Sequence, residues 1–186
     1  MGNALEGKTV AFLIANEGAE QSEMLQPWQA VVAQGGRPVL ISPEPGEAQL
    51  FEHLDRGRTL PVDLPLAEAN PDDFDALVLP GGVANPDRLR TEPDAVKFAA
   101  AFFTAGRPVA AICHAPWLLV EGDLVRDRAM TSWPSLHTDV ANAGGRWVDE
   151  QVVICTNGPN TLVTSRKPQD LPAFCDAMTK QFAQAG

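Results

Sequence analysis

A thiol and an imidazole stand side by side in Ala111-Ile112-Cys113-His114-Ala115, directly after an apolar run. Small residues two positions before and after a nucleophile are typical of a nucleophile elbow, a tight strand-to-helix turn that leaves no room for bulk. The N-terminus of the following helix would lower the pKa of the Cys113 thiol and offer backbone N–H groups to an oxyanion. The pattern favours nucleophilic thiol chemistry. The alternative is a small buried core cysteine.

Two other segments could contribute to the same site, Glu17-Gly18-Ala19-Glu20 and Pro80-Gly81-Gly82. Each follows an expected strand, and sites in open α/β sheets form just past the carboxyl ends of strands. Glu17 or Glu20 could reach the thiol, where a carboxyl would have a raised pKa and could donate a hydrogen bond to sulfur. The two glycines would let a reacting oxygen approach backbone N–H groups. The alternatives are solvated loop acids and a plain turn.

The elements that position these residues alternate between strands and helices, which predicts a mostly parallel sheet covered on both faces. The expected fold is an α/β three-layer sandwich, with one domain over residues 1–186. Ser22, Thr91 and Asp170 are the expected helix caps. Residues 43–61 are expected to form a loop-rich insertion. The expected strands cover residues 9–15, 37–42, 76–79, 108–112, 129–132, 152–155 and 162–165, and the expected helices cover 23–34, 91–105, 114–120 and a C-terminal segment after 170.

The composition excludes several classes of protein. A net charge of −10 argues against nucleic acid and anionic membranes as partners. No apolar run approaches the ~20 residues that span a bilayer, and Met1 to Glu6 shows no signal-peptide pattern. Three cysteines without Cys-x-x-Cys spacing indicate reduced thiols in a cytoplasmic protein, with Cys155 and Cys175 as core residues. Neither a phosphate loop nor a dinucleotide fingerprint is found, so we expect no cofactor and no metal.

Four separate segments together resemble the PfpI family, which belongs to the class I glutamine amidotransferase-like superfamily with the parkinsonism-associated deglycase proteins. They are residues 74–82, 108–114, 142–149 and 162–166. The resemblance extends from about Lys8 to Phe182, nearly the whole chain. It implies a flavodoxin-like sandwich and a homo-oligomer, a dimer or larger.

The resemblance also implies roles for individual residues. Cys113 matches the family's nucleophile, and His114 matches the histidine that follows it. Glu20 matches the glutamate that hydrogen-bonds the reactive thiol. The oxyanion region matches Gly81, Gly82 and the amide of His114.

Two further residues are expected near the site. Asp87 matches an acid that some members supply to the Cys–His pair of a neighbouring subunit. It stands where the archetypal protease has Glu, and its side chain is one carbon shorter. Trp117 is expected near the site, with a core position as the alternative. Ala115 stands where Gly is common, and its methyl group narrows the pocket or alters the elbow.

Members of this family include intracellular proteases, glyoxalase III type enzymes, protein deglycases and oxidative-stress proteins. We therefore expect a cysteine-dependent enzyme that acts on carbonyls, with small carbonyl compounds, peptides or glycated proteins as substrates. The alternative is a non-enzymatic oxidative-stress protein whose Cys113 oxidises to sulfenic or sulfinic acid. An amidotransferase is disfavoured, because residues 165–170 contain no histidine.

Overall fold

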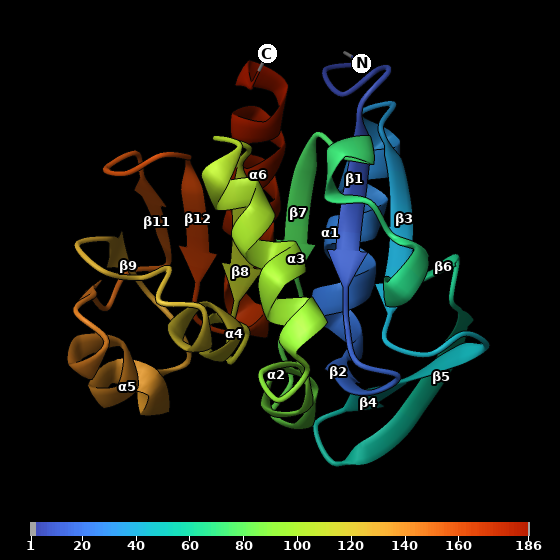
Figure 1. Cartoon of the computed structure of the whole chain (residues 1–186), viewed down its shortest axis with the longest axis horizontal. Helices are drawn as coiled ribbons and strands as arrows, with labels where there is room; N and C mark the ends of the chain where they lie inside the picture. Colours follow the sequence, from blue (N-terminus) through green and yellow to red (C-terminus); the bar gives the residue numbers. More distant parts are fainter. Residues whose placement is uncertain (1–2, 186) are drawn as a thin grey trace.

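The computed structural model describes residues 3–185. Of the domain expected over residues 1–186, Met1, Gly2 and Gly186 lie outside the described residues, and Met1 and Gly2 are also part of the N-terminal segment Met1 to Glu6. The centre of the structure is a seven-stranded sheet in which β11 alone runs antiparallel to its neighbour (Figure 1). In spatial order the strands are β11 (Val152–Cys155), β12 (Leu162–Ser165), β8 (Val109–Ile112), β7 (Ala76–Leu79), β1 (Thr9–Leu13), β3 (Arg37–Ser42) and β6 (Leu64–Pro65).

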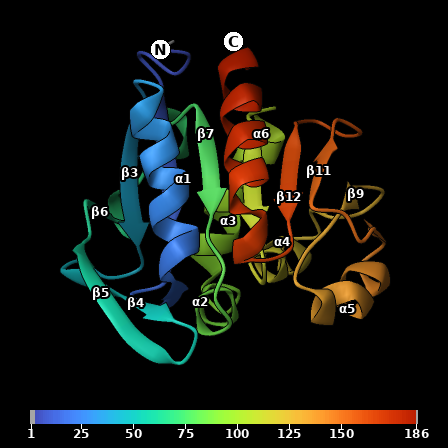
Figure 2. The ribbon, with the colours of Figure 1, turned by 180° about the vertical axis from the view of Figure 1, so that it is seen from behind.

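The central strands β7 and β8 are apolar throughout, and β1 is apolar after Thr9, because both faces of the sheet are covered. Along β1, Ala11 and Leu13 enter one core, whereas Val10 and Phe12 enter the other. This alternation follows from the two-residue period of a strand. Helix α3 (Pro93–Thr104) packs on the first core, and α1 (Gln21–Ala33) and α6 (Leu171–Gln184) pack on the second (Figure 2). The expected three-layer α/β/α fold is confirmed.

Short elements gather at the end of the sheet toward which the parallel strands point (Figure 1). They are α2 (Ala84–Leu89), α4 (Pro116–Glu121) and α5 (His137–Asn142). The small parallel pair β9 (Ala129–Met130) and β10 (Arg146–Trp147) lies nearby and replaces the longer strand expected over 129–132. Functional residues that follow β1, β7 and β8 are therefore brought to one place.

The expected loop-rich insertion over residues 43–61 is wrong. The segment forms a β-hairpin of β4 (Glu47–Glu52) and β5 (Asp55–Pro61), which joins β2 (Glu17–Glu20) in a separate three-stranded sheet. Most residues of β5 are exposed, so no face of that strand is required to be apolar. The sequence consequently lacks the alternation that identifies a half-buried strand.

Two of the three expected caps, Ser22 and Thr91, are wrong, and the third, Asp170, is at the expected N-cap position. Helix α1 begins at Gln21 with Glu20 at its N-cap position, and α3 begins at Pro93 with Glu92 at that position. Asp170 does precede α6 but makes no capping hydrogen bond. Its carboxylate instead accepts hydrogen bonds from the backbone and the guanidinium of Arg166. Asp170 thus occupies the cap position but bonds Arg166, four residues earlier in the chain, rather than the start of its own helix.

Candidate active site

Cys113 occupies a strained turn between β8 and α4. Its φ angle is +64°, which is uncommon for any residue but glycine and typically costs about 1–3 kcal/mol. Backbone hydrogen bonds hold the turn: the N–H of Cys113 donates to the Ser165 carbonyl at 3.0 Å, and its carbonyl accepts from the N–H of Trp133 at 2.8 Å. The side chain is 6% exposed. This is the backbone geometry of a nucleophile elbow.

The elbow brings His114 back onto the cysteine although the two residues are adjacent. The Nδ1 atom of His114 lies 3.2 Å from the Cys113 sulfur. Two indoles flank the imidazole, Trp117 edge-on with ring centroids 5.2 Å apart and Trp133 stacked at 5.6 Å. Burial lowers the pKa of His114 to about 4, so the ring is neutral at neutral pH and can accept the thiol proton.

The carboxyl group beside the thiol belongs to Glu23, so the expected assignment of Glu20 to this place is wrong. Glu23 and Cys113 pack against the same position: a methyl group built on Gly81 would overlap the Glu23 carboxylate and lie 2.6 Å from the cysteine Cβ. Glu20 turns the other way, toward the hairpin. Its carboxylate accepts the backbone N–H of His53 at 3.0 Å and lies 3.9 Å from that residue's Nδ1.

The start of α1 explains this difference. The expected cap at Ser22 places Glu23 at the helix edge, but the helix begins at Gln21, and Glu23 lies in its first turn. Its side chain is fully buried. Glu20 ends β2 instead, where strand geometry directs its side chain toward β4 and β5. The burial of Glu23 on the first turn of α1 and the position of Glu20 at the end of β2 thus decide which glutamate meets the thiol.

Burial dominates the electrostatics of Glu23. It raises the pKa of the carboxyl to about 8, with a further contribution from the negative charge of Glu20. The Cys113 thiol and the backbone N–H groups of Gly81 and Gly82 act in the opposite direction. Neither carboxyl oxygen has a partner in good hydrogen-bond geometry. Glu23 is therefore a protonated acid at neutral pH, and it can donate a hydrogen bond.

The pKa of the Cys113 thiol is raised, contrary to the expected lowering. Burial is the main cause, followed by the negative charge of Glu23 in its ionised form, and the amides of Gly82 and His114 oppose them. Helix α4 starts at Pro116, and burial outweighs whatever its N-terminus contributes at the sulfur. When Glu23 carries its proton, its Coulombic effect is absent. The thiolate is thus most accessible while Glu23 is neutral.

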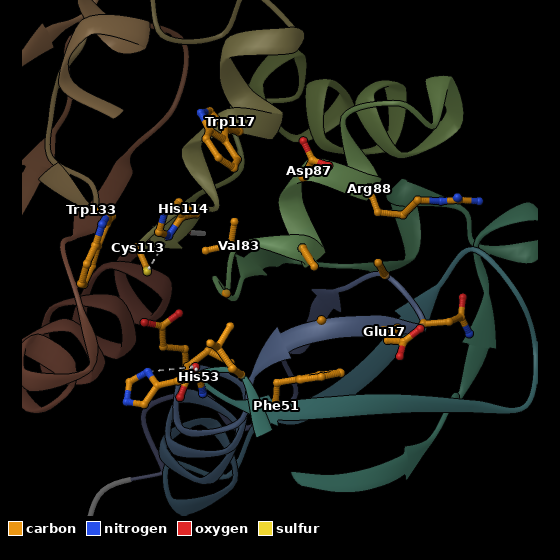
Figure 3. A pocket seen from close by; sticks show the side chains of 18 of the residues that line it. Glu17, Phe51, His53, Val83, Asp87, Arg88, Cys113, His114, Trp117 and Trp133 are labelled. Atoms are coloured by element: carbon orange, nitrogen blue, oxygen red, sulfur yellow. Dashed lines mark hydrogen bonds and ion pairs between the residues drawn. The ribbon is translucent and has the colours of Figure 1, made fainter. Parts of the chain in front are cut away.

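A cavity of about 1020 Å³ opens in front of the sulfur (Figure 3). One wall carries His114, Trp117 and Trp133, and the opposite wall comes from the small sheet and its hairpin, with Glu17, Phe51 and His53. Between them lie Val83, Asp87 and Arg88. Gly82 and Leu54 also line the cavity. The expected site residues Cys113, His114, Gly82, Trp117, Asp87 and Glu20 all line this cavity.

Of the expected site residues, Gly81 does not line the cavity, and Asp87 lines it at an exposed position. Gly81 lies behind the cavity, between Glu23 and Cys113, and its carbonyl accepts the N–H of Glu20 at 3.3 Å. Asp87 is exposed at the cavity wall. Among residues 3–185, no hydrogen bond or ion pair joins it to the Cys–His pair of its own chain. Its contribution to chemistry therefore remains a prediction.

Sequence reasoning missed Asn85 and Trp133 besides Glu23. Asn85 is buried and ties the glycine loop to the end of β1, since its amide donates to the carbonyls of Pro80 and Gly81 at 2.9 and 3.0 Å and accepts the Ala15 N–H at 2.7 Å. The sequence offered one signal for this role, a polar residue three positions after Gly82. Trp133 offered none, because 20 residues separate it from the elbow in sequence.

The other two cysteines differ from each other. Cys155 is buried in the core around α3, where burial raises the pKa of its thiol but the guanidinium of Arg128 and nearby backbone amides outweigh burial and lower it. Cys175 is half-buried on α6, and burial raises the pKa of its thiol to about 11. Neither lines the cavity. Within residues 3–185, no group of three or more His, Cys, Asp or Glu side chains is arranged to hold a metal ion.

The sequence pattern of the DJ-1/PfpI family matches residues 8–181. The chain belongs to this family. Among the relatives of this member is "Deglycase PH1704" of Pyrococcus horikoshii, 40% identical over 171 residues, which cover 92% of this chain and 97% of the relative. "General stress protein 18" of Bacillus subtilis and "Protein/nucleic acid deglycase 2" of Escherichia coli are each 38% identical over 90% of this chain, which covers 94% and 93% of those relatives respectively.

A solved structure shows the same fold. Drosophila melanogaster DJ-1beta superposes with a TM-score of 0.82 at 25% identity, over 95% of this chain and 90% of that one. The flavodoxin-like architecture expected from the resemblance is thereby confirmed. No helix within the described residues 3–185 has the length and apolar character needed to cross a membrane.

The name of the Escherichia coli relative runs against the exclusion of nucleic acid. The exclusion rests on the charge of −10, which disfavours binding to a phosphate backbone. The charge argument does not apply to a carbonyl adduct on a single base. The charge argument therefore applies to duplex or strand binding and leaves adduct chemistry open.

Proposed function

We propose that this DJ-1/PfpI protein is a Cys113-dependent enzyme that acts on carbonyl adducts, of the deglycase type. The observation that carries the proposal is a strained cysteine whose sulfur lies 3.2 Å from a neutral, buried imidazole, at the base of a cavity. The deglycase names of relatives at 38–40% identity support the same chemistry. Substrates are small carbonyl compounds or glycated peptides and proteins.

The first step is addition of sulfur to the carbonyl carbon of the adduct. A sulfur–carbon bond forms, the C=O electron pair moves to oxygen, and the thiol proton passes to Nδ1 of His114. The amides of Gly82 and His114 lie at the sulfur and can donate to the developing oxyanion. The protonated imidazole then returns its proton to that oxygen, which leaves a hemithioacetal on Cys113. Where the attacked carbon also carries nitrogen, the oxyanion instead re-forms C=O, the carbon–nitrogen bond breaks, and the nitrogen takes the imidazole proton and leaves as free amine. Water then hydrolyses the thioester that remains on Cys113. Neutral Glu23 supports the thiolate by a hydrogen bond.

The test follows release of free amine and loss of adduct from a methylglyoxal-treated peptide. Cys113→Ala should abolish turnover, whereas Cys175→Ala, the matched control on α6, should retain it. Consumption of free methylglyoxal and hydrolysis of an unmodified peptide are measured in parallel to identify the substrate class. Equal rates for wild type and Cys113→Ala, or no turnover in either, would refute the proposal.

A redox role for the same thiol is the second candidate, and the position of Glu23 favours it. A sulfinate on Cys113 would place its oxygens beside a protonated carboxyl that lacks a hydrogen-bond partner. Mass spectrometry after graded peroxide should find sulfenic and then sulfinic acid at Cys113 first. Oxidation of Cys155 or Cys175 with Cys113 still reduced would exclude this role.

We also propose, from the family resemblance, that the protein assembles as a homo-oligomer with Asp87 near the contact between subunits. Asp87 is exposed at the cavity wall, where an approaching subunit can reach it. Light scattering should show a dimer or larger assembly for the wild type. A monomer at working concentration would contradict this.

A further inference from the structure

Two hydrogen-bonded tryptophans enclose His114. Trp133 stacks on the imidazole with an interplanar angle of 22°, and Trp117 meets it at 61° (Figure 3). Indole rings on two sides exclude water from the imidazole, which is consistent with its exposure of 7%. The neutral state of the His114 imidazole, in which it can accept a proton, therefore depends on the positions of the Trp117 and Trp133 indoles.

Trp117 is held from behind by α5. Its Nε1–H donates to the carboxylate of Asp139 at 2.8 Å, and the guanidinium of Arg90 lies 5.8 Å from the ring centroid. A hydrogen bond to an ionised carboxylate is roughly twice as strong as a neutral one. Asp139 itself does not line the cavity. It is therefore placed to fix the indole without contacting a ligand.

Trp133 is held by hydrogen bonds that involve Ser132, in the segment after β9, and Trp147 in β10. The Ser132 hydroxyl donates to the Trp133 carbonyl at 2.9 Å and accepts the Nε1–H of Trp147, also at 2.9 Å. The Trp133 N–H in turn donates to the Cys113 carbonyl. A chain of hydrogen bonds thus runs from Trp147 through Ser132 and Trp133 to the strained elbow.

We infer that Asp139 and Trp147 are positioning residues for the Cys113–His114 pair, acting through Trp117 and Trp133 respectively. The inference rests on the proposed function. Without the acceptor at position 139, the Trp117 ring is free to turn away, and water reaches one side of His114. Without the Trp147 donor, Ser132 loses the partner that fixes its hydroxyl, and the Trp133 carbonyl loses its restraint. Both changes loosen the imidazole without removing a group that touches substrate.

The charged and titratable groups that share the cavity with the imidazole or contact its indoles come from several elements. They are Cys113 at the elbow, Glu23 on α1, Asp87, Arg88 and Arg90 in and after α2, Asp139 on α5, and, across the cavity, Glu17, Glu20, Glu44 and His53. None of these is altered in a Trp147 variant. A change in His114 shared by Asp139 and Trp147 variants is therefore caused by position and hydration rather than by a lost charge.

The experiment measures the pKa of His114 by NMR on histidine-labelled protein, together with kcat and KM on the glycated peptide. In Asp139→Ala we expect the pKa to rise from about 4 toward the ordinary value of 6.5, because the ring becomes hydrated. We expect kcat to fall about tenfold with KM unchanged, because the imidazole is no longer held at the sulfur and loses part of the 10²–10⁴ that a positioned acid–base group supplies. This loss outweighs the gain from a pKa nearer the working pH. Asp139→Asn keeps an acceptor oxygen and should rescue both. Asp176→Ala, an exposed aspartate paired with Lys180 on α6, is the control and should change neither.

Two further variants keep the inference testable if Asp139→Ala is poorly folded. Trp117→Phe keeps a ring but lacks the N–H, and its effect should not add to that of Asp139→Ala, because both break one bond. Trp147→Phe should raise the His114 pKa in the same direction. An unchanged His114 pKa in Asp139→Ala and Trp147→Phe, or full additivity with Trp117→Phe, would overturn the inference. An inactive wild type with these NMR shifts intact would instead refute the proposed function and leave the positioning role standing.

Discussion

Replacing Glu23 by Gln should change how stability depends on pH. The native pKa of Glu23 is about 8, and its ordinary value is 4.5. A group whose pKa is raised on folding binds more protons in the native state, so its contribution is complete below pH 4.5 and is lost as pH rises toward 8. The free energy of unfolding of the wild type therefore falls over this range because of Glu23.

The two pKa values set the size of the effect. With 1.36 kcal/mol per pKa unit, the loss is about 1 kcal/mol at pH 5, about 3 at pH 7 and about 4 at pH 8. Glutamine has a similar shape and does not titrate. Between pH 5 and pH 8 the wild type should thus lose about 3 kcal/mol more stability than Glu23→Gln.

Urea denaturation followed by tryptophan fluorescence measures this difference directly. Wild type, Glu23→Gln and the control Glu68→Gln, an exposed residue, are compared at pH 5, 6, 7 and 8. The wild-type and control curves should run parallel, and both should diverge from that of Glu23→Gln as pH rises. Parallel curves for all three proteins would show that Glu23 is not a buried acid with a raised pKa, and the argument for a neutral carboxyl beside Cys113 would fail.

Three further expectations concern the same region. The iodoacetamide rate of the Cys113 thiol in wild type, divided by that in Glu23→Gln, should be constant below about pH 7 and fall as pH rises through 8, because ionised Glu23 opposes the thiolate; a constant ratio up to pH 9.5 would contradict this. Gly81→Ala should destabilise the protein by about 1–3 kcal/mol in thermal unfolding, since its methyl group would lie 2.6 Å from the cysteine Cβ; a wild-type Tm would show that the loop relaxes freely. Glu20→Ala should raise KM for a glycated peptide and leave the alkylation rate of Cys113 unchanged, because Glu20 holds the hairpin tip at His53. Glu20→Gln should retain the wild-type KM. Equal effects of Glu20→Ala on KM and on the alkylation rate would place Glu20 at the thiol.

Local sequence patterns were sufficient to predict most strands of the central sheet. Buried parallel strands are continuous apolar runs, so the strands before Gly81 and Cys113 could be identified from their residues alone. Small residues around Cys113 predicted the tight turn, and its φ of +64° confirms it. The hairpin over 47–61 escaped prediction because exposed strands need no apolar alternation.

Chemistry within the site depended on contacts between distant segments. The sequence by itself determined that a cysteine and a histidine meet at a strand-to-helix turn, because this feature is local. It also predicted an acid from the first βα unit nearby, because the carboxyl ends of parallel strands meet at one edge of a sheet. The tertiary structure alone decided that the acid is Glu23, that Trp133 covers His114, and that burial raises the pKa of the thiol. Helix register and desolvation depend on packing between elements, and no short stretch of sequence contains that information.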